Sequence, residues 1–377
     1  MNPTRRSRTA RPVPIDLALQ GGGSHGAFTW GVLDRLLDEP SIAFDGVSGT
    51  SAGALNAGVM ASGFAAGGRE GAQAALRAFW RDVAGVPGCF GDGSAGIAAP
   101  SAAGLSPWFP ALPAMPAIPL AAFNPDLNPF FATWQWLLRG ISPAQLDPLG
   151  LGTLERVARR HVDEAAMRRG PMKLFVTATA VRSGRPHVFS GDALSVDALL
   201  ASACLPQLFR PVEIDGEPYW DGGYSGNPAL WPVIYETATR DLLLVKINPL
   251  WRPGTPDSAA GIADRVNEIT FNAGLVAEMR AIHFVQRLLA DRRLDRRRYR
   301  ALRLHMVADD EGLAPLHPSS KLVTDWRFLE QLHALGRAAA ERWLRAHRGD
   351  LGRRSSLDVE ATFLAPRSGD GAGERPR

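Results

Sequence analysis

The first sixty residues contain two short apolar segments, each followed by a glycine-rich turn and then by a helical pattern. Residues 15–20 and 44–48 have the length and apolar character of buried strands, whereas residues 27–37 and 51–60 carry apolar or small side chains at helical spacing. Strand and helix that alternate over so short a stretch are typical of a parallel sheet covered on both faces. The sequence therefore predicts an α/β fold.

Later segments extend this pattern. Asp215-Gly216 is a strong hairpin turn between two short apolar runs, 211–214 and 217–220. Further strands are predicted at 173–181, 242–247 and 300–307, and further helices at 151–161, 197–204, 262–282 and 326–347.

Composition narrows the classes of function. The net charge of +4 over 377 residues is too small to favour a nucleic-acid partner, and two cysteines 115 positions apart, Cys89 and Cys204, suit a reducing, cytoplasmic location without a cysteine-based metal site. Arginines concentrate before residue 12 and in 287–303. These two segments are either solvated surface or places of peripheral contact with anionic lipid. The oligomeric state is not indicated by the sequence.

Three segments differ from the rest of the chain. Residues 1–14 are basic and polar and are expected to form a disordered arm, and residues 349–377 to form a polar, disordered tail, so that the folded domain spans 15–348. Within it, 93–140 is an apolar, proline-rich insertion, whose part 93–125 has seven prolines and no charged side chain. That proline density excludes a helix and predicts either a packed loop or a flap beside a lipid site.

The turn after the second strand carries a candidate nucleophile. Gly49-Thr50-Ser51-Ala52-Gly53 is a G-x-S-x-G sequence between a predicted strand and a predicted helix. A serine on such a sharp turn is held in a strained conformation beside free N–H groups of the helix N-terminus, and the glycines leave room for the turn. Ser51 is therefore the candidate nucleophile.

The turn after the first strand has two interpretations. Gly21-Gly22-Gly23-Ser24-His25-Gly26 resembles a dinucleotide-binding loop, with Asp45 as the acid for the ribose, but Asp45 precedes the carboxyl end of its strand, where such an acid belongs. The alternative is an oxyanion hole made of glycine N–H groups. Parallel strands end at the same edge of a sheet, which predicts that this loop lies beside Ser51.

A base for Ser51 has to come from another part of the chain. Asp221 ends a hairpin strand, and Gly222 and Gly223 allow a tight turn that exposes its carboxylate. Asp215 is the other candidate base, but the Asp-Gly hairpin turn already accounts for an aspartate at that position. A carboxylate in a partly apolar site has a raised pKa and is a better base, so Asp221 is preferred.

These motifs together resemble the patatin-like phospholipases, a family of lipid acyl hydrolases. The resemblance covers roughly residues 15–230 and rests on the glycine loop 21–26, the elbow 49–53, the Asp221-Gly222-Gly223 motif and the approach to it, Ala201–Pro206 with Phe209, Pro211, Val212, Ile214 and Asp215-Gly216. The chain departs from the family at His25, where an arginine or lysine is usual.

The resemblance implies a three-layer α/β/α fold with a mainly parallel sheet. It also implies hydrolysis of a lipid or acyl ester by a dyad, with Ser51 as nucleophile and Asp221 as proton acceptor, without metal or cofactor. The N–H groups of the glycine loop, chiefly those of Gly22 and Gly23, would form the oxyanion hole.

Three other functions stay open on the sequence. The first is an α/β-hydrolase with a triad of Ser51, Asp221 and His305 or a later histidine, although only one strand precedes the elbow. The second is a non-catalytic protein that binds lipid surfaces. The third is binding of NAD by the glycine loop.

Overall fold

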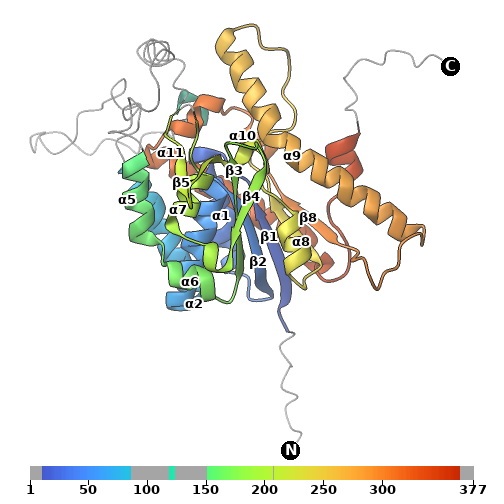
Figure 1. The fold of residues 1–377 in the computed structure, drawn as a ribbon. Coiled ribbons are helices and arrows are strands. Elements are labelled where there is room, and N and C mark those ends of the chain that lie inside the picture. Colours follow the sequence, from blue (N-terminus) through green and yellow to red (C-terminus); the bar gives the residue numbers. More distant parts are fainter. Residues whose placement is uncertain (1–10, 86–118, 124–150, 207, 366–377) are drawn as a thin grey trace, which may run out of the picture.

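The computed structural model describes residues 11–85, 119–123, 151–206 and 208–365 (Figure 1). The arm at 1–14 is described only from residue 11 onwards. The insertion at 93–140 lies outside the described residues apart from 119–123, as do positions 366–377.

A single mixed sheet forms the centre of the described structure. Its order is β5-β6-β3-β2-β1-β7-β8, with β4 also paired to β3. The five strands β3, β2, β1, β7 and β8 are parallel, β4 and β6 run antiparallel to β3, and β5 runs antiparallel to β6. The strands are β1 Val13–Leu19, β2 Ile42–Thr50, β3 Lys173–Ala180, β4 Pro186–Ser190, β5 Val212–Ile214, β6 Glu217–Asp221, β7 Asp241–Val245 and β8 Arg303–Val307.

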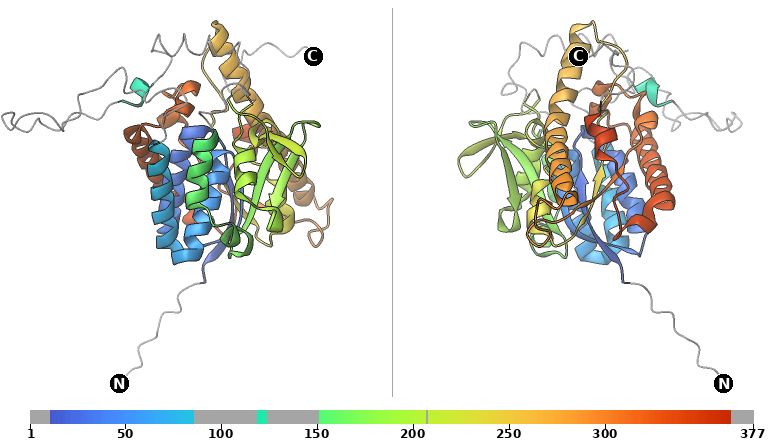
Figure 2. Two further views of the ribbon diagram at one scale, coloured as in Figure 1. Left: turned by 60° about the vertical axis from the view of Figure 1, so that its left-hand side comes forward. Right: turned by 90° about the vertical axis from the view of Figure 1, so that its right-hand side faces the viewer.

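Helices cover both faces of the sheet (Figures 1 and 2). One face packs against α1 Gly26–Leu37, α2 Ala52–Ala84, α5 Leu151–His161, α6 Glu164–Arg169, α7 Val196–Ser202 and α11 Trp326–His347. The other face packs against α8 Trp231–Glu236 and α9 Ala259–Ala290. The expected three-layer α/β/α fold is confirmed. The remaining helical turns are η1 Gly23–His25, η4 Leu120–Phe123, η7 Gly191–Ala193, η8 Gly222–Tyr224, α10 Asp310–Leu313, η9 Pro318–Leu322, η10 Arg348–Asp350 and η11 Glu360–Leu364.

The apolar strand β7 shows why the sheet needs two helical layers. Leu243 and Val245 belong to the core under α1 and α11, whereas Leu242 and Leu244 belong to the core under α9. Side chains alternate between the faces of a strand, so four consecutive apolar residues, Leu242–Val245, have to be covered on both sides.

Helix α2 is longer than the sequence predicts and is a helical hairpin. Gly67 and Gly68 have non-helical backbone angles, and Gly68 adopts φ 61°, which glycine tolerates. The second half returns along the first, where the indole N–H of Trp80 donates to Asn56 Oδ1 at 3.0 Å. The hairpin thereby places Trp80 near the start of α2.

The folded body extends beyond residue 348, where the sequence predicts a polar tail. Leu351 and Val359 are buried, and residues 349–365 are described. Isolated apolar residues in an otherwise polar stretch give no periodic signal, although each one can fill a gap at the edge of a core. None of the helices in the described ranges combines the length and apolarity required to cross a bilayer.

Candidate active site

The candidate site lies at the edge of the sheet where the parallel strands end. Leu19, the last residue of β1, pairs with Gly49 near the end of β2. The glycine loop follows the first of these strands and Ser51 follows the second. The predicted proximity of loop and elbow therefore follows from the register of two neighbouring strands.

Ser51 occupies the sharp turn between β2 and α2. Its backbone has φ 54° and ψ −126°. Residues other than glycine rarely adopt a positive φ. Its N–H donates to the Ser202 hydroxyl at 2.8 Å, and that hydroxyl donates to the Thr177 carbonyl at 2.6 Å. Neighbouring parts of the fold thus hold the strained turn in place.

The glycines of the elbow are required by close packing. A Cβ on Gly53 would lie 2.2 Å from the Leu19 carbonyl oxygen, and one on Gly49 would lie 2.7 Å from the Gly53 carbonyl oxygen. Gly26, at the start of α1, is equally constrained, because its Cβ would lie 2.6 Å from the Cβ of Ala52. The small residues of both motifs let α1 and α2 begin directly against the strand ends.

Gly53→Ala is accordingly expected to lower the free energy of unfolding by at least about 2 kcal/mol, since overpacking against backbone cannot relax by side-chain rotation. Urea denaturation measures the change. Gly152→Ala is the matched control, because Gly152 in α5 has nothing within 4 Å of an added Cβ. A Gly53→Ala protein as stable as the control would contradict this account of the elbow.

Asp221 ends β6 and is buried at 0% exposure. Its Oδ1 accepts from the Gly223 N–H at 2.7 Å. Burial raises the pKa of this carboxyl to about 7, while the hydrogen bonds from Gly223 and from Ser51 and the charge of Lys321 act in the lowering direction. The structure thus brings Ser51 and Asp221 together, as predicted.

The second carboxylate oxygen, Oδ2, is buried and makes no well-formed hydrogen bond within the described residues. A carboxylate oxygen without a competing donor is available as a proton acceptor. The two positions after Asp221 have no room for a side chain. A Cβ on Gly222 would lie 2.0 Å from the Thr177 carbonyl oxygen, and one on Gly223 would lie 2.3 Å from the Phe271 ring.

Side-chain amides hold the glycine loop against the elbow. A Cβ on Gly21 would lie 2.6 Å from the Ser51 Cβ, so loop and nucleophile are in direct contact. The Gly21 N–H donates to Asn227 Oδ1 at 2.6 Å, and its carbonyl accepts from Asn248 Nδ2 at 2.7 Å. Gly21 consequently has no N–H to offer a ligand. The N–H groups of Gly22 and Gly23 donate no hydrogen bond within the described chain, which leaves them as the candidate anion donors.

His25 carries no charge in this environment. Its pKa is lowered well below the ordinary value, first by burial and then by the positive charges of Lys321 and Arg252. Its Nε2 lies 2.8 Å from the Ser320 hydroxyl, and that hydroxyl donates to the His317 carbonyl. Nε2 therefore carries the proton and donates it, and Ser24 and His25 form a buried turn rather than a charged one.

A cavity of about 160 Å³ opens beside Ser51. Apart from Ser51 and a few polar groups, its walls are apolar. They consist of Gly23, Ser24, Ala52, Leu55, Phe79, Trp80, Val83, Leu154, Ala203, Leu205, Leu208, Phe209, Lys321, Leu322 and Thr324. No histidine is among the described residues that line it.

The structure places the rival residues elsewhere. The carboxylate of Asp45 accepts from the Thr239 hydroxyl at 2.8 Å, before the start of β7 and thus away from the strand ends that bear the loop. His305 lies within β8 between Asp241 and Ser356, at 3.1 and 2.8 Å. Neither arrangement favours a ribose acid or a catalytic triad. Asp215 sits in the β5–β6 turn with φ 52°, as its Asp-Gly sequence predicts.

Sequence reasoning missed the residues that support the site. Gln20 Oε1 accepts from the N–H groups of Ile247 and Asn248, both at 2.9 Å, and thereby joins the end of β1 to the chain after β7. Asn227, Asn248 and Lys321 also contact the loop or the cavity from distant parts of the chain. Single amides and lysines form no motif, so no local signal identifies them.

A family model, patatin-like phospholipase, matches residues 17–234. Among solved structures, VipD from Legionella pneumophila is similar with a TM-score of 0.40 and 14% identity, over 94% of this chain and 73% of that chain. A search of curated protein sequences found no match. The matched segment runs from the first strand past the Asp221 turn and covers more than half of the chain, and the chain therefore belongs to the patatin-like phospholipase family.

Proposed function

We propose that this protein is a serine hydrolase that cleaves carboxylic esters of lipids through a dyad of Ser51 and Asp221. The observation that carries the proposal is the pairing of a strained serine with a buried carboxylate whose pKa is raised to about 7. At neutral pH such a carboxyl group is about half ionised, and its ionised form is basic enough to accept a proton.

In the first half of the reaction, Ser51 Oγ attacks the ester carbonyl carbon while Asp221 takes the hydroxyl proton. The carbonyl π electrons move to oxygen, and the N–H groups of Gly22 and Gly23 stabilise the resulting oxyanion. When the tetrahedral intermediate collapses, the C–O bond to the alcohol breaks and Asp221 returns the proton to the leaving oxygen. An acyl group is then left on Ser51.

In the second half, water attacks the acyl carbon and gives its proton to Asp221. The bond between Oγ and the acyl carbon breaks, and Ser51 regains the proton from Asp221. The products are a fatty acid and an alcohol, which for a phospholipid is a lysophospholipid.

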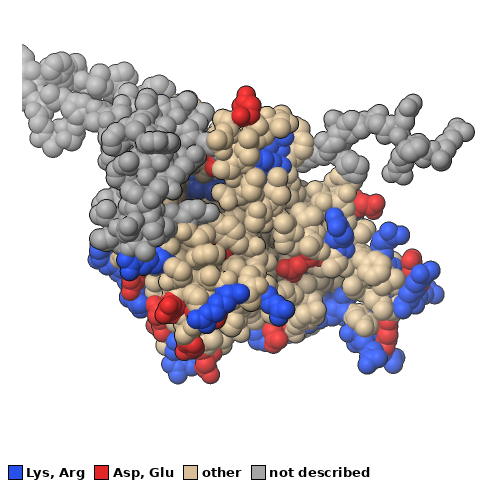
Figure 3. Space-filling view, turned by 45° about the horizontal axis from the view of Figure 1, so that its top comes forward, with Lys and Arg blue, Asp and Glu red and all other residues tan. Residues whose placement is uncertain are grey.

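Two features support a lipid as substrate. The cavity beside Ser51 has apolar walls that suit an acyl chain. Ile262, Val266 and Ile269 recur at helical spacing on α9 and are half exposed, which suits contact with a lipid surface. Figure 3, which looks onto the edge of the sheet that bears the site, shows uncharged residues over much of the middle of this face.

The direct test is incubation of the protein with phosphatidylcholine vesicles and with a short p-nitrophenyl ester, followed by mass spectrometry of the products. We expect free fatty acid and lysophospholipid in equal amounts from the first and p-nitrophenol from the second. Vesicle binding without hydrolysis of either ester would instead favour a non-catalytic lipid-binding protein.

Leu154→Trp is expected to shorten the acyl chain that the enzyme accepts. Leu154 lines the cavity from α5, so a larger side chain there narrows the space for the acyl chain. The ratio of kcat/KM for a long to that for a short p-nitrophenyl ester should fall about tenfold, as a few lost methylene contacts imply. Arg156→Trp adds the same bulk to the exposed side of α5 and should leave the ratio unchanged. An equal ratio in both variants would place the acyl chain elsewhere.

A further inference from the structure

A lysine from the far end of the chain lies beside the glycine loop. Lys321 belongs to η9, outside the matched residues 17–234, and it lines the same cavity as Ser51 and Gly23. Its carbonyl oxygen would lie 2.4 Å from a Cβ on Gly23, so η9 packs directly on the loop. A buried ammonium group is costly unless its surroundings compensate it, which raises the question of what this one does.

A single amide joins the Lys321 ammonium to the loop. Nζ donates to Asn248 Oδ1 at 2.8 Å, and the Nδ2 of the same amide donates to the Gly21 carbonyl at 2.7 Å. Asn248 is a neutral partner, and Lys321 forms no ion pair within the described residues. The charge of the ammonium is therefore not cancelled by direct contact.

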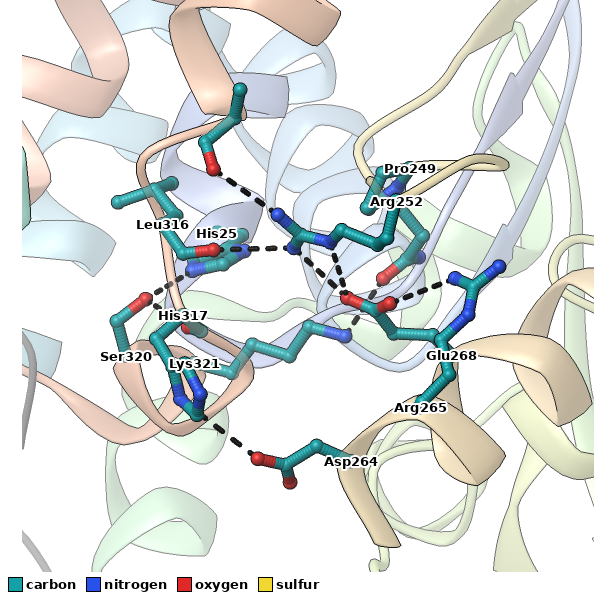
Figure 4. Close-up of polar contacts among 12 residues, drawn as sticks. His25, Pro249, Arg252, Asp264, Arg265, Glu268, Leu316, His317, Ser320 and Lys321 are labelled. Carbon is teal, nitrogen blue, oxygen red and sulfur yellow. Dashed lines mark hydrogen bonds and ion pairs between the residues drawn. The ribbon is translucent and has the colours of Figure 1, made fainter. Parts of the chain in front are cut away.

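The carboxylates near Lys321 are engaged by other groups (Figure 4). Glu268 on α9 binds Arg252 at 2.9 Å and Arg265 at 3.0 Å, one through each oxygen. Asp264, also on α9, lies 3.8 Å from His317. Asp221 of the dyad is a further acid whose charge acts on Lys321.

The loop itself supplies no cation. His25 is the basic residue of the Gly21–Gly26 loop, and it is held neutral. Lys321 thus brings a positive charge to the loop from η9, a different element of the fold.

We infer that Lys321 is a positioning residue, which acts through Asn248 to hold the Gly21–Gly23 loop and gives the site the positive potential that His25 does not. This inference rests on the proposed function. Two effects follow from it. The N–H groups of the loop stay directed at the position of the oxyanion. The positive charge of Lys321 favours the ionised form of Asp221.

Lys321→Met tests the inference, because it keeps an unbranched apolar stem and removes the charge. On a short neutral p-nitrophenyl ester we expect kcat to fall about 10- to 100-fold, less than the loss on deleting an oxyanion donor, with KM nearly unchanged. The acidic limb of the kcat/KM profile should move to higher pH, because Lys321 lowers the pKa of Asp221. Lys321→Arg should restore part of kcat and return the limb toward its original pH.

Controls separate this inference from the proposed function. Lys173→Met removes an exposed lysine at the start of β3 and should change neither kcat nor the pH profile. If wild type hydrolyses the ester and Lys321→Met retains its kcat and its acidic limb, the positioning role is wrong and the dyad stands. A Lys321→Met protein that differs from wild type only in a higher KM for phospholipids would also overturn it, because Lys321 would then bind a headgroup. If wild type hydrolyses no ester, the proposed function fails and this inference fails with it.

Discussion

Replacing Ser51 by alanine is expected to lower kcat at least about 10³-fold on both a p-nitrophenyl ester and a phospholipid, as removal of the nucleophile does in serine hydrolases. The physical reason is that no acyl-enzyme can form without Oγ, and the oxyanion donors alone stabilise attack by water only weakly. Steady-state kinetics with matched protein concentrations measures the change.

The fold should survive this substitution. Ser51 keeps its positive φ through the packing around it, and its N–H, which alanine retains, makes the bond to Ser202. Thermal melting should therefore differ little between Ser51→Ala and wild type. Ser62→Ala, on the same helix α2 and outside the cavity lining, is the matched control and should keep full activity. Undiminished hydrolysis by folded Ser51→Ala would exclude Ser51 as nucleophile.

Asp221→Asn is expected to cause a second loss of at least about 10³ in kcat, because an amide cannot accept the hydroxyl proton. For the wild type, kcat/KM should fall as the pH drops below about 7, where Asp221 becomes protonated. A pH–rate profile with an acidic limb near 7, absent from the residual activity of Asp221→Asn, is the expected result. Asp215→Asn, in the exposed turn of the same hairpin, should behave as wild type.

Asp221→Asn should also be more stable than wild type at high pH. Folding raises the pKa of Asp221 from 3.8 to about 7, so the folded state binds its proton more tightly than the unfolded state does. Ionisation of Asp221 therefore destabilises the folded wild type. This destabilisation is absent below about pH 4, grows as the pH rises to about 7 and is complete above it. Asp221→Asn should therefore melt higher than wild type at pH 8. A variant that is both inactive and less stable at pH 8 would contradict this account of the carboxylate.

Much of the site could be predicted because its chemistry lies in short motifs. A glycine loop, a serine elbow and an aspartate turn each specify a local backbone shape, and the parallel pairing of β1 with β2 then forces loop and elbow together. The position of Asp221 beside Ser51 needed more, since β6 joins the sheet through β3. The resemblance to a family supplied that step.

The residues that support the site could not be predicted, for a physical reason. Gln20, Asn227 and Asn248 act through hydrogen bonds to backbone groups far away in the chain, and Lys321 acts through an enclosed charge. Such contacts depend on the folded path of loops and leave no periodicity or spacing in the sequence. The same holds for Leu351 and Val359, whose burial extends the fold beyond residue 348.

Covalent labelling tests the central claim most directly. Wild type is treated with a fluorophosphonate, which reacts with activated serines, and the modified peptide is identified by mass spectrometry. The account predicts one adduct, on Ser51, that is lost in Ser51→Ala and forms much more slowly in Asp221→Asn. Ester hydrolysis by wild type together with an adduct on a different residue, or with no adduct on Ser51, would contradict it.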